Sequence, residues 1–148
     1  IVNSILSAEQ KCAENGVKLT KRRKEVLTAL LECNTALSAY ELTERCNQQG
    51  EPAMPPMSVY RILEFLEEQS LVHRLSTTNK YIACSHISCD HSHFRRPQFL
   101  ICNDCTRVQE VNVTPETLKA IERVAANVGF NLGDKQLEVS GTCSDCTQ

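Results

Sequence analysis

The sequence predicts an α+β protein of two unequal domains, an N-terminal winged helix-turn-helix and a smaller C-terminal α/β domain with a tetracysteine zinc site. Four segments of helical apolar periodicity followed by two short strand-like runs indicate the first domain. The second is indicated by two Cys-x-x-Cys pairs, Cys102/Cys105 and Cys143/Cys146. Four thiolates at about 2.3 Å from one zinc ion form a closed structural site, which leaves no position open for catalysis.

Length and composition agree with two small domains. The chain has 148 residues, nine cysteines and a net charge of −2. A small domain buries little apolar core, so a structural metal ion that stabilises the C-terminal part is expected. Its apolar runs are too short to cross a bilayer and its start lacks the features of a secretory signal, so we expect a cytoplasmic protein. The expected boundaries are 1–84 for the winged-helix domain, 85–97 for a hinge and 98–148 for the second domain, which is expected to mediate dimerisation.

Three helices are expected in the first third of the chain. The first covers about residues 3–15 and ends at Gly16, a residue type common just after a helix. Thr20 is a suitable N-cap for the second helix. Ser38, with Glu41 three residues later, forms a capping box that starts the third.

The fourth helix, from about residue 57 to 69, has two different faces. Val59, Ile62, Leu63 and Leu66 recur at helical spacing and are expected to be buried. Tyr60 and Arg61 lie on the opposite face near the start, with acidic residues only in later turns. Since phosphates would repel those acids, the N-terminal end is expected to enter the major groove, as recognition helices do.

We expect some residues of these helices to contact DNA bases and others to contact phosphates. Arg61 would contact guanine and Tyr60 a thymine methyl group, with Ser58 beside them. Basic residues cluster at the start of the second helix, where Lys21 and Arg23, together with Tyr40, would hold phosphates. From charge alone, the alternative of a solvated helix end stays open.

Two short runs, residues 71–75 and 80–84, are expected to pair as a hairpin, the wing. A two-residue turn at Thr78 and Asn79 would place His73 directly opposite Cys84, with Cβ atoms about 4.5–5.5 Å apart. Both side chains could then reach one metal ion. A thiolate beside an imidazole favours zinc over iron or manganese.

The C-terminal part is predicted to contain three strands and one helix. Strands are expected at residues 98–101, 108–113 and 135–140, and a helix from Pro115 to Gly129 whose apolar face covers a core. The last strand returns the chain to the second Cys-x-x-Cys pair. Such a small sheet leaves a strand edge free, and edge-to-edge homodimerisation is the expected use of that edge.

Four motifs resemble the ferric uptake regulator family. They are residues 19–27 (LTKRRKEVL), 38–42 (SAYEL), 58–66 (SVYRILEFL) and 100–105 (LICNDC). The resemblance covers nearly the whole chain and is greatest to the zinc-sensing branch. It implies a homodimeric repressor that binds AT-rich palindromic operators of zinc uptake genes when zinc is replete. It also implies a regulatory metal site at the hinge, and so two zinc ions per monomer.

The resemblance further implies the ligands of the regulatory site. His73 and Cys84 match the wing ligands, and Glu110 matches the ligand that follows the first cysteine pair. The hinge departs from the family pattern by a small insertion, so the remaining ligand is His93 or His91, of which we prefer His93. A second departure is Lys21, where many relatives have proline.

Other functions fit the sequence less well. An iron or peroxide sensor of the same family is the nearest alternative. A thiol oxidoreductase would need Cys-x-x-Cys at the start of a helix, and neither pair precedes a helical pattern. The remaining cysteines of the helices, Cys12, Cys33 and Cys46, are interpreted as small apolar fillers.

Overall fold

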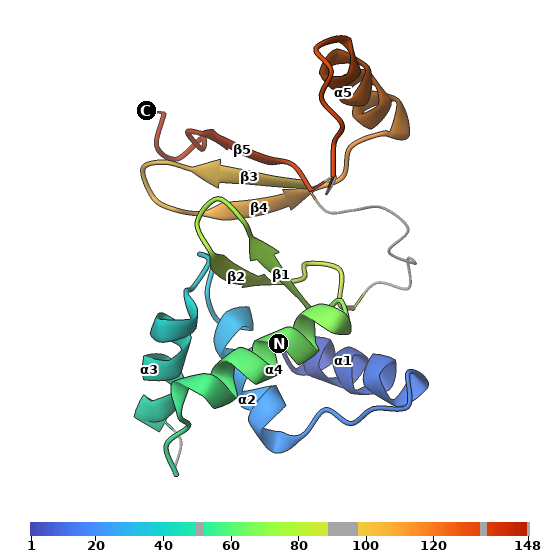
Figure 1. Cartoon of the computed structure of the whole chain (residues 1–148). Helices are drawn as coiled ribbons and strands as arrows, with labels where there is room; N and C mark the ends of the chain where they lie inside the picture. The colour runs from blue at the N-terminus through green and yellow to red at the C-terminus, as the bar shows by residue number, and fades with distance from the viewer. Residues whose placement is uncertain (50–51, 89–97, 134–135, 148) are drawn as a thin grey trace. The chain divides into compact units, whose positions relative to one another are not determined.

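A computed structural model describes residues 1–49, 52–88, 98–133 and 136–147. The chain divides into two compact units, Ile1–His91 and Ser92–Gln148 (Figure 1). The division lies inside the segment expected to be a hinge. None of the described helices combines the length and apolar character needed to cross a membrane.

The N-terminal unit begins with four helices, of which α2 and α3 start at side-chain caps. Their bounds are α1 Val2–Glu14, α2 Lys21–Leu31, α3 Ala39–Gln49 and α4 Pro56–Glu68. The Thr20 hydroxyl accepts a hydrogen bond from the backbone N–H of Arg23. Ser38 and Glu41 cap α3 reciprocally, at 3.1 and 3.3 Å, as the capping box predicted. Gly16 follows α1 with a φ of 72°, a left-handed conformation that glycine adopts without strain.

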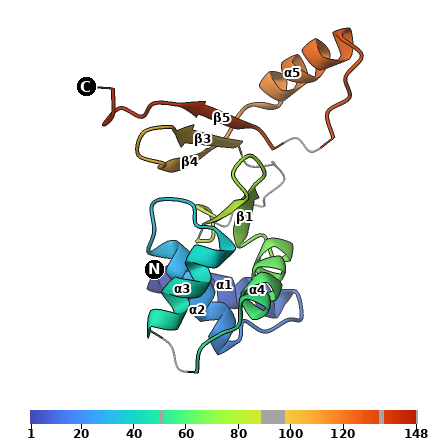
Figure 2. The ribbon, with the colours of Figure 1, turned by 60° about the vertical axis from the view of Figure 1, so that its left-hand side comes forward.

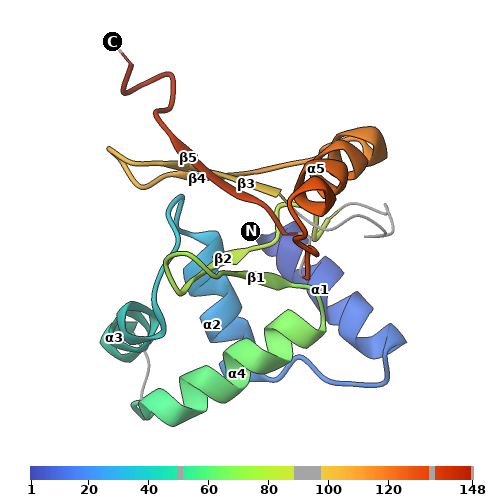
Figure 3. The ribbon, with the colours of Figure 1, turned by 45° about the horizontal axis from the view of Figure 1, so that its top comes forward.

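One apolar core joins these helices. Contacts link α2, α3 and α4 pairwise, and α1 packs on α2. Leu27, Leu42 and Leu63 are completely buried, one from each of α2, α3 and α4. Helix α4 runs beside the hairpin and α2 (Figure 3). Its buried residues are Val59, Leu63 and Leu66, as its apolar periodicity predicted.

The wing is an antiparallel hairpin of β1 (Val72–Leu75) and β2 (Lys80–Ala83). Its register differs from the predicted one. His73 pairs with Ile82, not with Cys84, because the connection has four residues (76–79) instead of two. Cys84 instead donates its backbone N–H to Leu71 O at 2.9 Å. A shift of two residues preserves the face on which each side chain lies, so His73 and Cys84 remain on one face as diagonal neighbours.

The C-terminal unit is a three-stranded sheet with one helix. Its elements are β3 Gln98–Cys102, β4 Val108–Val111, α5 Pro115–Asn127 and β5 Glu138–Gly141. The central strand β3 pairs antiparallel with β4 and parallel with β5 (Figure 2). The first and last of the predicted strands are therefore neighbours, which brings the two cysteine pairs to the same end of the sheet.

Helix α5 differs from the prediction that it covers a core of its own domain. It lies beyond one end of the sheet, not across its face, and contains no buried residue (Figures 1 and 2). Val124 and Val128 are 68% and 80% exposed. Only three described residues of this unit, Gln98, Phe99 and Cys102, are buried. The described part of this unit therefore has very little apolar core.

Candidate metal centre and nucleic-acid interface

The four cysteines of the C-terminal unit come together as predicted. Cys102 ends β3 and Cys105 lies in the turn that follows, while Cys143 and Cys146 flank a turn just after β5. Parallel pairing sets Cys102 against Gly141, so both turns lie at the same end of the sheet. All four sulfur atoms lie within 4.8 Å of one another.

The distances fit a tetrahedral zinc ion. The Sγ atoms of Cys105 and Cys143 are 3.6 Å apart, and two thiolates on a tetrahedron with zinc–sulfur bonds of about 2.3 Å stand about 3.8 Å apart. Neither cysteine pair begins a helix among the described residues, unlike the reactive pair of a thiol oxidoreductase. The set is suited to a closed structural site and could hold zinc with four thiolates.

Backbone groups prepare part of this site for negative charge. Hydrogen bonds from the backbone of Cys105 and Cys143 lower the pKa of the Cys102 thiol to about 6. The N–H of Cys143 lies 3.3 Å from the Cys102 sulfur. By contrast, the neighbouring thiols of Cys143 and Cys105 raise the pKa of Cys146 to about 12. Since four thiolates repel one another at these distances, a cation is needed for all four to be ionised.

A salt bridge joins the two turns that carry the cysteines. Arg107, two residues after Cys105, donates a hydrogen bond of 2.9 Å from Nη1 to Asp145 Oδ2, which lies between Cys143 and Cys146. Both side chains are exposed, so the free energy of this pair is small. Its geometric effect is to connect the first cysteine turn to the second.

The wing carries two of the predicted regulatory ligands. A ring nitrogen of His73 and the Sγ of Cys84 lie within 4.8 Å of each other. The diagonal register therefore brings together two groups that could bind one ion. Glu110 is half-buried on β4 of the other unit, where its position in the strand register is opposite Phe99 of β3. His91 and His93 lie outside the described residues.

The exposed face of α4 matches the predicted recognition surface. Tyr60 is 46% exposed, Arg61 is exposed and Ser58 is half-buried. Met57, in the first turn, is 63% exposed. These side chains lie on the face away from the buried leucines. Their contact with DNA stays a prediction.

The three predicted phosphate ligands have different surroundings. Lys21 is exposed at the start of α2, and Tyr40 is 69% exposed at the start of α3. A hydrogen bond to Glu44 raises the pKa of the Tyr40 hydroxyl. Arg23 is half-buried, and its guanidinium already has two partners, because it stacks on the Phe65 ring and donates a hydrogen bond to Lys18 O. No local sequence signal indicates this contact, since Phe65 belongs to another helix.

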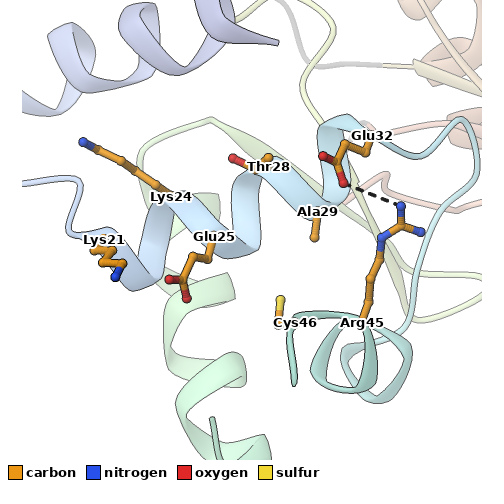
Figure 4. A pocket seen from close by; sticks show the side chains of 8 residues that line it. All are labelled: Lys21, Lys24, Glu25, Thr28, Ala29, Glu32, Arg45 and Cys46. Atoms are coloured by element: carbon orange, nitrogen blue, oxygen red, sulfur yellow. Dashed lines mark ion pairs between the residues drawn. The ribbon is translucent and has the colours of Figure 1, made fainter. Parts of the chain in front are cut away.

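A groove of about 300 Å³ between α2 and α3 was also not predicted (Figure 4). Its lining mixes both signs of charge, and an ion pair of 3.6 Å joins Arg45 to Glu32 at one side. Cys46 lies on the α3 side of the groove. Burial raises the pKa of this thiol, with a further contribution from Glu25, so it is a poor nucleophile at neutral pH. The described lining residues do not resemble a metal site.

Comparisons with known proteins agree with these features. The model of the ferric uptake regulator family matches residues 14–140. The zinc uptake regulation protein of Escherichia coli (strain K12) is 34% identical over 148 residues, covering 97% of this chain and 81% of the relative. A protein of the same name from Mycobacterium tuberculosis is 32% identical over 134 residues, covering 88% of this chain and 95% of the relative. A solved structure of a zinc uptake regulator complexed with zinc and DNA is 33% identical, with a TM-score of 0.82, covering 99% of this chain and 96% of the other.

Proposed function

Because the chain belongs to the ferric uptake regulator family, we propose that it is a zinc-responsive transcriptional repressor. In this proposal it binds AT-rich palindromic operators as a homodimer and controls zinc uptake genes. Relatives named as zinc uptake regulation proteins, at 34% and 32% identity, support zinc as the sensed metal.

The observation on which this proposal depends most is the pair of metal ligands in the wing. A nitrogen of His73 and the sulfur of Cys84 lie within 4.8 Å on the hairpin that directly follows α4. Leu71 and Val72, at the junction of α4 and β1, are completely or nearly completely buried in the core. A metal bound to the wing is therefore connected through packed side chains to the helix with the exposed Tyr60 and Arg61.

We propose that each monomer binds two zinc ions. The four cysteines of the C-terminal unit would hold the structural one. His73, Cys84, His93 and Glu110 would hold the regulatory one, with His91 as the alternative to His93. Two imidazoles, one thiolate and one carboxylate are ligands that zinc accepts in tetrahedral sites.

The regulatory ligands come from the wing, the hinge and the C-terminal unit. Residues so far apart in the sequence can bind one ion only if those parts are held together. Zinc binding would therefore hold the two winged-helix domains of a dimer at a spacing that suits successive major grooves. Without the zinc ion, fixing this spacing on the operator would cost free energy. The coupling free energy between two such sites is typically about 1–3 kcal/mol.

On the operator, α4 would read bases and the starts of α2 and α3 would hold the backbone. Arg61 has the planar fork needed for bidentate contact with guanine, and Tyr60 offers an apolar edge to a thymine methyl group, with Ser58 beside them. Lys21 and Tyr40 are exposed at helix starts and would contact phosphates. Because Glu64 and Glu68 are exposed further along α4, only its first turns would approach the DNA closely.

Metal analysis combined with DNA binding tests the proposal. Wild-type protein and the Cys84→Ser variant are purified without added zinc, and their zinc, iron and manganese contents are measured. Both are then tested for binding to an AT-rich palindromic duplex with zinc and with chelator. We expect the variant to retain the structural zinc and to lose both the second zinc and the zinc-stimulated binding.

A matched control is Cys33→Ser, which changes a half-buried cysteine of the same unit that has no proposed metal role. It should behave as the wild type. Equal zinc content and equal stimulation in the wild type and Cys84→Ser would remove the zinc-sensor assignment. Stoichiometric iron or manganese at the second site would favour the iron or peroxide sensor instead.

A further inference from the structure

Two parts of the N-terminal unit hold the Arg23 guanidinium. Its Cζ lies 3.6 Å from the centroid of the Phe65 ring on α4. Its Nη1 donates a hydrogen bond of 2.7 Å to the backbone oxygen of Lys18, in the connection between α1 and α2. A planar cation that is both stacked and hydrogen-bonded is fixed in position and in orientation.

The surroundings of Arg23 connect it to a third part of the unit. Burial raises the pKa of the Cys12 thiol near the end of α1, and the charge of Arg23 acts against that shift. The main chain of Arg23 is anchored too, because its N–H donates to the Thr20 hydroxyl at 3.4 Å. Arg23 therefore lies where α1, the start of α2 and α4 meet.

Its partner Phe65 is well placed to control the recognition helix. Phe65 is half-buried, packs against the core and lies one helical turn after Arg61. Because an α-helix is rigid over one turn, a rotation of α4 about its axis moves Phe65 and Arg61 together. Holding the Phe65 ring therefore restricts the direction in which Arg61 can point.

We propose that Arg23 is a positioning residue for the recognition helix and not a phosphate contact. Through Phe65 and Lys18 it fixes the rotation of α4 against α2, so that Tyr60 and Arg61 are presented to base edges in one orientation. This inference rests on the proposed DNA-binding function. It replaces the phosphate-binding role that the basic cluster suggested from sequence.

The two roles predict different effects on DNA binding. A phosphate contact acts on every sequence, and its loss weakens the salt dependence, lowering the slope of log K against log salt by about one. A positioning residue acts only on the orientation of base-reading groups. Its loss therefore lowers affinity for the specific site and leaves random DNA binding and the salt slope unchanged.

The test uses the zinc-loaded protein, four single variants, one double variant and a control variant. A duplex probe is selected by the wild type from a random-sequence pool, and a scrambled duplex of the same composition serves as the non-specific probe. Affinity for both is measured over a salt series for Arg23→Lys, Arg23→Gln, Phe65→Leu and Phe65→Tyr. Arg45→Lys is the matched control, because this arginine forms only an exposed pair with Glu32 among the described contacts.

We expect Arg23→Lys, Arg23→Gln and Phe65→Leu each to weaken binding to the selected duplex by about three- to thirtyfold, the range set by a cation–π contact. Binding to the scrambled duplex and the salt slope should stay at wild-type values. Phe65→Tyr keeps the ring and should restore affinity, and the double variant Arg23→Lys/Phe65→Leu should be no weaker than either single one. A purely structural defect would instead weaken binding to both duplexes.

Several results would overturn the inference. Full affinity in Arg23→Lys, or a lower salt slope with equal losses on both duplexes in Arg23→Gln, would show a phosphate contact. If an Arg23 variant does not fold, judged by its thermal transition, the comparison of Phe65→Leu with Phe65→Tyr decides. Failure of the wild type to select any sequence would overturn the proposed function and this inference with it. Selective wild-type binding with unaffected variants would overturn the inference alone.

Discussion

Loss of the structural metal should unfold the C-terminal unit and leave the N-terminal unit folded. The perturbation is Cys143→Ser, which removes one of four sulfurs that lie within 4.8 Å of one another. The two units differ greatly in what else holds them together. Eighteen buried residues form one core cluster in the N-terminal unit, whereas only three described residues of the C-terminal unit are buried.

The size of the effect follows from this difference. Structural zinc contributes about 10–16 kcal/mol in small zinc-dependent domains near neutral pH. Whole domains are typically stable by only about 5–15 kcal/mol. Since the described sheet has little apolar core to compensate, a site with three sulfurs and a poor fourth ligand should not keep it folded. The homodimer contacts that we propose for this unit should be lost with it.

Hydrogen exchange measures both units in one sample. Amides of the central strand β3 should exchange slowly in the zinc-loaded wild type, because β3 is paired on both sides. In Cys143→Ser they should exchange close to the rate of an unfolded chain, while amides of α2 and α4 stay protected. Cys46→Ser is the control, since that thiol lies on α3 of the N-terminal unit. Slow exchange of β3 amides in zinc-free Cys143→Ser would refute the role given to the metal.

Three further outcomes are expected. Arg61→Ala should cost about 1–3 kcal/mol in operator binding and relax selectivity at one base position, measured with a panel of single-base operator variants; an equal loss on random DNA would contradict a base contact. Ser38→Ala should lower the free energy of unfolding by about 1 kcal/mol through loss of the α3 cap, measured by denaturant titration; an unchanged midpoint would show that the cap contributes nothing. Because burial raises the pKa of the Cys46 thiol, a smaller fraction of it is ionised at pH 7 than of an ordinary thiol, so its alkylation should be slow there and accelerate only at a more alkaline pH than that of an exposed cysteine. Mass spectrometry of pulse-alkylated protein checks this, and rapid labelling of Cys46 at pH 7 would show that the thiolate is accessible.

Local sequence signals predicted the helices because the groups that start and end them lie within a few residues of each other. Thr20 and the Ser38–Glu41 pair cap the helices that the periodicity indicated. The same holds for the cysteine cluster, since each Cys-x-x-Cys pair forms its own turn and parallel pairing of β3 and β5 brings the turns together.

Features that depend on distant partners were less predictable. The hairpin register depends on the geometry of its turn, and Asn79 adopts a left-handed φ of 53° within a four-residue connection. Charge alone does not distinguish an arginine that stacks on Phe65 from one that binds phosphate. The apolar stripe of α5 predicted a buried face, but none of its residues is fully buried within the described part of this chain. Homodimerisation, which we propose, would provide a cover that the sequence of one chain does not reveal.

The most direct test of the account is operator affinity measured against buffered free zinc while the tetracysteine zinc is retained. Fluorescence anisotropy with the selected duplex gives the dissociation constant at each zinc concentration, and metal analysis of the same samples gives the occupancy of the second site. We expect affinity to rise by about 5- to 150-fold as that site fills, with no rise in Cys84→Ser. An affinity that stays constant from one zinc ion per monomer to two would contradict zinc control of DNA binding.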